Sequence, residues 1–228
     1  MSTLSMTTLT PPATAVRPVP PRGRPAPLNF AARGPSQQRR AELREAGARV
    51  LAGSGADGAM GEIARSIGIR PASISNFYPR KHDLIYDILH SHVDGLMEHV
   101  GSSEDAEADA DPFVRLTCMV QAWLDYVLSY RDEQRMALTM LDHLPASQSE
   151  VLRYQLRLLA HRLAMAVEAV VPDLGDAPAL RRPVSLSLMA AINTAVLWFR
   201  DDGVLSREDF TVLLANQAVA GARAMLTP

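Results

Sequence analysis

The sequence predicts an all-α protein, and three observations support that fold class. Apolar residues make up 47% of the 228-residue chain but aromatic residues only 5%, so Ala, Leu, Val and Met supply most of the apolar side chains. That mixture suits helices better than sheets. Apolar residues recur at spacings of three and four, and no stretch alternates polar and apolar residues for long enough to predict a strand. We expect about nine helices.

Charge is distributed unevenly along the chain, although the formal net charge is only −2. Residues 1–35 carry four arginines and no acid, residues 36–100 carry eight groups of each sign, and residues 101–228 carry eleven basic and seventeen acidic groups. A local basic face, rather than the net charge, decides whether a protein can bind nucleic acid. The composition therefore does not exclude DNA binding.

Cysteine content and hydropathy indicate the compartment. Cys118 is the only cysteine, so no disulfide can form within the chain, and its apolar neighbours predict a buried structural thiol. The sequence has no signal-peptide pattern and no apolar run long enough to cross a membrane. We expect a cytoplasmic protein with no membrane partner.

Residues 1–35 contain eight of the sixteen prolines and show no helical or strand period. This composition predicts a disordered tail. Its arginines could contact a phosphate backbone or a minor groove, or the tail could be solvated with no fixed role. These arginines are Arg17, Arg22, Arg24 and Arg33.

Residues 36–80 are predicted to form a small domain of three short helices. The first spans about residues 36–52, and the glycines Gly53, Gly55 and Gly58 end it. Two shorter helices follow with a stop at Gly68 between them; their apolar positions are Ile63, Ala64 and Ile67, then Ile74, Phe77 and Tyr78. Two short helices joined by a tight turn form a helix-turn-helix, whose second helix turns its polar side outward. Double-stranded DNA is the first candidate partner.

Residues 81–228 are predicted to form a larger helical domain. The apolar pattern predicts helices over about residues 81–100, 113–131, 147–171, 183–200 and 207–226, with a shorter segment ending near 143. An acidic surface loop is expected at 101–112. Ser206 and Asp209 have the spacing of a capping box, which would start the last helix.

The last two predicted helices carry small residues at helical spacing, which permits close approach between helices. Two interpretations fit equally well: a helical hairpin within one chain, or a two-helix face that meets a second copy in a four-helix bundle about a twofold axis. For the second interpretation, the predicted dimer-interface residues are Leu186, Ala190, Thr194, Leu197, Leu214, Ala218 and Ala222.

The helix-turn-helix region resembles the tetracycline-repressor (TetR) family of bacterial regulators over about residues 38–90. The matching motif reads Ile63-Ala64, Gly68-Ile69, Phe77-Tyr78, Pro79, Lys81 and Leu84-Ile85. A weaker similarity covers residues 198–210, which look like the loop between the family's two dimerising helices. The resemblance implies a three-helix DNA-binding domain, followed by a helical effector-binding and dimerisation domain, in a homodimer.

The resemblance also implies which residues face DNA, because the family's recognition helix enters the major groove. Arg70, Ala72, Ser73, Ser75 and Asn76 would reach the bases, and Arg39, Arg40, Tyr78 and Lys81 would contact the backbone. Asn can pair with adenine and Arg with guanine. The chain departs from the family at Met60, where Thr is usual, and at Ser75, where Tyr is usual. Both missing groups commonly touch phosphates, so their loss would weaken binding without changing its mode.

Met and aromatic residues on the predicted long helices could line an adaptable apolar cavity for a small molecule, or they could be ordinary core. The candidate pocket residues are Met97, Met119, Trp123, Tyr126, Met136, Met140, Met165 and Met189. No cofactor is implied. His90, His92 and His99 share one predicted helix but do not converge, so we predict no metal site, and no catalytic grouping is convincing.

We therefore expect a DNA-binding transcriptional regulator, a repressor, that leaves a palindromic operator when a small-molecule effector binds, and we expect no enzymatic activity. The alternative is an all-helical effector-binding protein or enzyme that has lost DNA binding, which the departures at Met60 and Ser75 motivate. A helical protein-interaction module is a third interpretation, which a monomeric mass in solution would favour.

Overall fold

The part of the chain that the structure describes folds into nine α-helices and two 3₁₀ helices and contains no strand. The structure is a computed structural model that describes residues 35–55 and 59–226, so the arginines of the predicted tail lie outside the described residues. The elements are α1 (Pro35–Ser54), α2 (Met60–Ser66), α3 (Pro71–Ile74), α4 (Lys81–Ala106), α5 (Pro112–Ser129), α6 (Arg131–Thr139), η3 (Leu141–His143), α7 (Ala146–Val170), η4 (Pro172–Asp176), α8 (Pro178–Trp198) and α9 (Arg207–Leu226). The predicted all-α class is confirmed.

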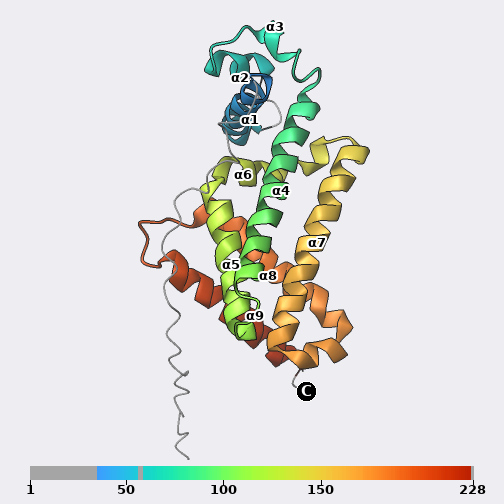
Figure 1. The fold of residues 1–228 in the computed structure, drawn as a ribbon, viewed down its shortest axis with the longest axis vertical. Coiled ribbons are helices and arrows are strands. Elements are labelled where there is room, and N and C mark those ends of the chain that lie inside the picture. The colour runs from blue at the N-terminus through green and yellow to red at the C-terminus, as the bar shows by residue number, and fades with distance from the viewer. Residues whose placement is uncertain (1–34, 56–58, 227–228) are drawn as a thin grey trace, which may run out of the picture.

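Helices α1, α2 and α3 gather at one end of the molecule, and α5, α7, α8 and α9 form a bundle at the other end (Figure 1). Helix α4 runs from the first group into the bundle, and α6 lies between α1 and the bundle (Figure 1). Helix α1 packs mainly on α6 and α4, whereas α8 packs on α5, α6, α7 and α9. Helices α4 and α6 are therefore the elements that join the two ends.

Two hydrophobic cores follow this arrangement. The first core joins α1, α2, α3 and the start of α4 to α6 and the start of α7, and it includes Leu43, Ile63 and Ile74. The second core fills the bundle and includes the fully buried Trp123. Met97 of α4 packs against both cores. Because α4 contributes to both cores, a shift of this helix would change side-chain packing at both ends of the molecule.

Helix α4 is longer than predicted, because it continues to Ala106 through part of the expected acidic loop. The hydroxyl of Ser103 donates to the main-chain oxygen of Val100 at 2.9 Å, and Glu104 pairs with Arg162 of α7. Glu and Ala also favour helix over loop. The acidic run is therefore the last turn of a helix held against α7, and only residues 107–111 connect it to α5.

Helix α8 begins earlier than predicted, at Pro178, and Pro183 lies inside it. Proline suits the first position of a helix because its missing N–H would have no partner there, which explains the start at Pro178. At the other end of the hairpin, the Ser206 hydroxyl accepts the N–H of Asp209 at 3.0 Å and donates to the Asp209 carboxylate at 2.8 Å. The predicted start of the last helix is confirmed.

Candidate nucleic-acid interface

Residues 70–78, which we name the recognition segment, follow a turn that glycine makes possible. Gly68 has φ +71°, in the left-handed region, so the chain reverses direction between α2 and α3. Pro71 then occupies the first turn of α3. Helix α3 is only four residues long and continues as turns, so the predicted second helix is shorter than its apolar spacing suggested. Pro79 contributes to this, because proline disfavours helix in the residue before it.

The polar side chains of the recognition segment face solvent. Arg70, Ser75 and Asn76 are exposed, as is Ala72, and Ser73 is half-buried. The core-facing residue between them, Ile74, is only 2% exposed and packs in the first core. The predicted base-contacting residues therefore lie on the outer side of the segment, at the end of the molecule remote from the bundle (Figure 1).

Two of the predicted cations, Arg40 and Lys81, lie beside the recognition segment. Arg39 pairs with Glu42 at 2.7 Å. Arg40 is exposed, and its guanidinium lies 5.3 Å from the centre of the Tyr78 ring. Lys81 is half-buried and is the first residue of α4. A cation at a helix N-terminus is mildly unfavourable, and a nearby anion would remove that cost.

Sequence reasoning missed Arg80, whose side chain is 69% exposed next to Lys81. Its main-chain N–H donates to the Asp83 carboxylate at 3.1 Å, and its guanidinium donates to the same group at 3.3 Å. An acid three residues after the cap is the signal that could have indicated this arrangement. The start of α4 therefore presents two adjacent cations.

Tyr78 occupies a different environment from the one predicted for a backbone-contacting residue. Its side chain is only 2% exposed, and its hydroxyl donates to the Asp87 carboxylate of α4 at 2.5 Å. Burial, and then the bond to Asp87, raise the pKa of Tyr78 above its usual range. The hydroxyl keeps its proton and has already committed it to Asp87, because a phenol has a single O–H donor.

The predicted dimer-interface residues of α8 and α9 fall into two groups by exposure. Leu186, Ala190 and Leu197 are exposed, and Thr194 and Ala218 are half-buried. Leu214 and Ala222, in contrast, are buried within the subunit, because α9 packs on α5 as well as on α8. The outer side of α9 carries Val212 and Leu213 instead, at 38% and 52% exposure. Small residues of α8 and α9 therefore lie both in the packing within the subunit and on the outer surface of the two helices.

The predicted pocket residues do not gather at one place. Met119, Trp123 and Tyr126 are buried in the second core, and the half-buried Met97 and Met189 pack against it. Met136 and Met140 belong to the first core, and Met165 is 49% exposed on α7. The spacing of apolar residues within one helix cannot show which of the two cores each residue joins. The group that remains together is Met97, Met119, Trp123, Tyr126 and Met189.

A buried polar network crosses the junction of α4, α5, α6 and α8. His92 lies 2.9 Å from Oε1 of Gln134, whose Nε2 donates to the main-chain oxygen of Asn193 at 3.2 Å. The indole N–H of Trp123 donates to Oδ1 of Asn193 at 2.9 Å. Burial lowers the pKa of His92 to about 4. The imidazole is therefore neutral near pH 7, and the network fixes four helices relative to one another.

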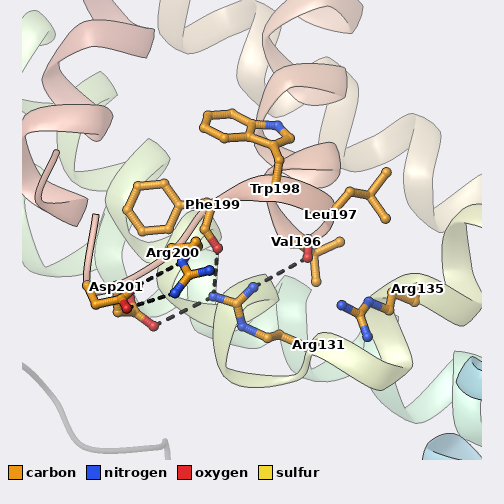
Figure 2. A pocket seen from close by; sticks show the side chains of 9 residues that line it. Arg131, Arg135, Val196, Leu197, Trp198, Phe199, Arg200 and Asp201 are labelled. Carbon is orange, nitrogen blue, oxygen red and sulfur yellow. Dashed lines mark hydrogen bonds and ion pairs between the residues drawn. The ribbon is translucent and has the colours of Figure 1, made fainter. Parts of the chain in front are cut away.

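A surface depression of about 550 Å³ lies where the start of α6 meets the end of α8 (Figure 2). Arg131 donates to the main-chain oxygens of Val196 and Phe199, both at 3.3 Å, and so satisfies carbonyls at the C-terminal end of α8 (Figure 2). The rim includes Leu197 and Trp198, which are 59% and 58% exposed. The depression thus belongs to the outer surface of the two-helix hairpin rather than to the buried Met and aromatic group.

Two of the α4 histidines, His92 and His99, share Tyr126 as an aromatic neighbour. His90 pairs with Asp94 at 2.9 Å, while His92 points into the network, and the His99 ring lies tilted against Tyr126 at 5.7 Å between ring centres. Within the described ranges, no three His, Cys, Asp or Glu side chains come together as a metal site would require. No helix among the described residues is long and apolar enough to span a membrane.

Sequence comparison identifies the C-terminal part of the chain. Residues 109–222, half of the chain, match the family model of the tetracyclin repressor-like C-terminal domain. No curated protein matches the chain. The matched region covers α5 to α9 almost completely, so the match concerns the bundle rather than the helix-turn-helix.

Solved structures share the whole fold. A TetR-family regulator from Bordetella parapertussis is 23% identical, with a TM-score of 0.75, and covers 80% of this chain and 95% of its own. The ketosteroid transcriptional regulator KstR2 of Mycobacterium tuberculosis is 18% identical, with a TM-score of 0.68 and coverage of 80% and 94%. AibR, solved with isovaleryl coenzyme A and operator DNA, is 20% identical, with a TM-score of 0.62 and coverage of 78% and 97%. Through the match over its C-terminal half, the chain belongs to the tetracycline-repressor (TetR) family of transcriptional regulators.

Proposed function

We propose that the protein is a homodimeric repressor that binds a palindromic DNA operator and releases it when a small molecule binds in the bundle. The observation that carries the DNA-binding part is the recognition segment, in which Arg70, Ser75 and Asn76 are exposed above the buried Ile74. Arg and Asn side chains can each make paired hydrogen bonds to a base edge in the major groove. The AibR structure contains operator DNA, which supports the same mode of binding here.

The outer surface of α8 and α9 supports the dimer. Leu186, Leu197, Trp198 and Leu213 are exposed large apolar residues on this surface, together with Val212. Contiguous exposed apolar area is uncommon on monomers and typical of subunit interfaces. A twofold axis between two such surfaces would make the operator palindromic, because each recognition segment would read one half-site. We propose Leu186, Ala190, Thr194, Leu197, Ala218, Val212 and Leu213 as the interface, without Leu214 and Ala222.

The effector would bind beside the buried Met and aromatic group of the second core, near Met97, Met119, Trp123, Tyr126 and Met189. A ligand can release DNA only if it binds the DNA-free form more tightly, and each 1.4 kcal/mol of preference changes operator affinity about tenfold. Helix α4 borders this group and also reaches the helix-turn-helix, so it is the element that would transmit the change.

Selection of bound duplexes from a random-sequence pool tests this proposal most directly. We expect enrichment of a palindrome whose half-sites are separated by about one helical turn, roughly 10 base pairs. Affinity for the selected duplex should fall steeply as the salt concentration rises, because phosphate contacts release counterions. A protein that had lost DNA binding would enrich no sequence and show no such salt dependence, which would overturn the proposal.

A further inference from the structure

Helix α3 is too short to hold its own orientation. A helix of four residues gains few internal hydrogen bonds, and isolated helices of this length do not persist in water. Beyond it, the recognition segment is closed by three main-chain hydrogen bonds: the Asn76 N–H donates to the Ser73 oxygen at 3.4 Å, and the N–H groups of Phe77 and Tyr78 both donate to the Ile74 oxygen, at 3.0 and 2.9 Å. The direction in which its polar side chains point must therefore be set by contacts with other helices.

Two buried side chains anchor the recognition segment, and the half-buried Phe77 between them also packs against the first core. The first is Ile74 in the first core, which fixes one point on the segment. The second is Tyr78 at its end, whose ring is buried and whose hydroxyl donates to Asp87 of α4. Ile74 and Phe77 hold the segment through apolar contacts, and the Tyr78–Asp87 hydrogen bond adds a directional contact that fixes its orientation.

Asp87 also binds α1. Its other carboxylate oxygen lies 3.5 Å from a guanidinium nitrogen of Arg44, and both side chains are largely covered, at 26% and 30% exposure. One turn earlier in α1, Arg40 lies over the Tyr78 ring and donates to the Phe77 oxygen at 3.4 Å. A single carboxylate thus connects the end of the recognition segment to both helices that support it.

We propose that Asp87 is a positioning residue for DNA recognition, which holds Tyr78 and Arg44 and thereby fixes the recognition segment against α1 and α4. The inference rests on the proposed operator binding, and it assigns a function to a residue that would not itself touch DNA. It also assigns Tyr78 a role within the protein, since the O–H that a phosphate would require is already donated to Asp87.

Amide hydrogen exchange in the DNA-free protein is the first test, because it does not depend on operator binding. We expect Asp87→Ala and Tyr78→Phe to speed exchange of the main-chain amides at positions 77 and 78 about tenfold. A factor of this size corresponds to the loss of one hydrogen bond to a charged group. Amides of α5 should be unchanged. Asp87→Asn keeps an acceptor oxygen and should restore much of the protection. The matched control is Glu98→Ala, which removes an exposed acid from the same helix. Unchanged exchange in Asp87→Ala would overturn the proposal.

Binding to the duplex that the wild-type protein selects from a random pool is the second test. Asp87→Ala and Tyr78→Phe should each weaken binding about tenfold, and the double variant should be no weaker than Asp87→Ala alone, because Asp87→Ala already removes the contact that Tyr78→Phe removes. The salt dependence should be unchanged. Affinity for a scrambled duplex should not fall, since Asp87→Ala removes a negative charge.

The opposite sign would refute the inference. If Tyr78 instead released Asp87 and donated to a phosphate, Asp87→Ala would tighten binding to the selected duplex, because a competing acceptor and a negative charge would both be gone. If the wild-type protein selects no sequence, the proposed operator binding fails, and the exchange experiment alone decides the role of Asp87.

Discussion

The imidazole of His92 donates its Nε2–H to Oε1 of Gln134, although His92 is only 4% exposed. The direction of this bond follows from the rest of the network: the Gln134 amide nitrogen donates to the Asn193 oxygen, which leaves its own oxygen as an acceptor. The other imidazole nitrogen, Nδ1, is buried without a hydrogen-bond partner. Charging this ring would therefore place a cation in a closed interior.

The free energy of unfolding should consequently fall as the pH is lowered through the range in which His92 is protonated in the unfolded chain but neutral in the folded protein. Burial lowers its pKa from 6.5 to about 4 in the folded protein. Between these values the unfolded chain binds the extra proton, so unfolding is favoured as pH falls, by about 3 kcal/mol in total for this one group. Urea unfolding at pH 7.5 and pH 4.5, at constant protein concentration, measures this loss.

Replacing His92 by Gln should flatten that pH dependence, because the titrating group is gone. The matched control is His90→Gln, which removes a half-exposed histidine paired with Asp94 from the same helix. That control should retain the wild-type pH dependence. An equal slope in His92→Gln and in the wild-type protein would show that other groups cause the acid sensitivity.

A methyl group at Gly95 should be destabilising, because helix α4 approaches Tyr126 of α5 there. A Cβ at Gly95 would overlap the Tyr126 hydroxyl oxygen and lie 3.1 Å from Cζ of the same ring. Overpacking of this kind costs about 1–3 kcal/mol, so Gly95→Ala should lower the free energy of unfolding by that amount. In contrast, a Cβ at Gly221 of α9 meets no heavy atom within 4 Å. Gly221→Ala should raise the free energy of unfolding by up to about 1 kcal/mol, because alanine has a higher helix propensity than glycine. Urea unfolding of both variants checks the pair, and a similar effect at both positions would contradict the close approach.

The order and type of the helices could be predicted from local patterns, because apolar spacing, glycine stops and the Ser206–Asp209 cap act within one segment of the chain. The details that differed depend on distant residues. Helix α4 continues to Ala106 because Arg162 of α7 pairs with Glu104 there. A run of charged residues therefore predicts a surface loop as long as the residue that pairs with it is unknown.

In the candidate site too, local patterns predicted some features, whereas others depend on distant residues. The motif identified the recognition segment and its exposed Asn76, since side-chain type and spacing suffice for that. It could not reveal that the Tyr78 hydroxyl is taken up by Asp87, nine residues later on another helix. Likewise, Leu214 is buried because α9 packs on α5, a contact that the pattern of α9 alone cannot show.

An acidic substitution on the outer surface of α8 or α9 should dissociate the proposed dimer. Leu197 and Leu213 are 59% and 52% exposed, so Leu197→Glu and Leu213→Glu should leave the fold of each subunit intact. In the dimer, however, each introduces a charge that must be buried without a partner, which is costly. Light scattering should report the monomer mass for both variants. Val151→Glu on α7, at 41% exposure, is the control and should remain dimeric. A wild-type monomer would contradict the dimer itself.

Asn76 and Lys81 should affect DNA binding in different ways, because we propose that Asn76 faces the bases, whereas Lys81 is the first residue of α4 and would contact the backbone. Asn76→Ala should weaken binding to the selected operator by about 1–3 kcal/mol and relax the preference at one base pair of each half-site. Lys81→Ala should weaken binding to every duplex similarly and lower the salt slope by about one. Mobility shifts with the selected and the scrambled duplex at several salt concentrations separate the two effects. Arg153→Ala removes an exposed cation of α7 that pairs with Asp142, and it should change neither quantity. If Asn76→Ala instead weakened both duplexes equally, Asn76 would be a backbone contact, and base reading would have to rest on Arg70 and the serines of the recognition segment.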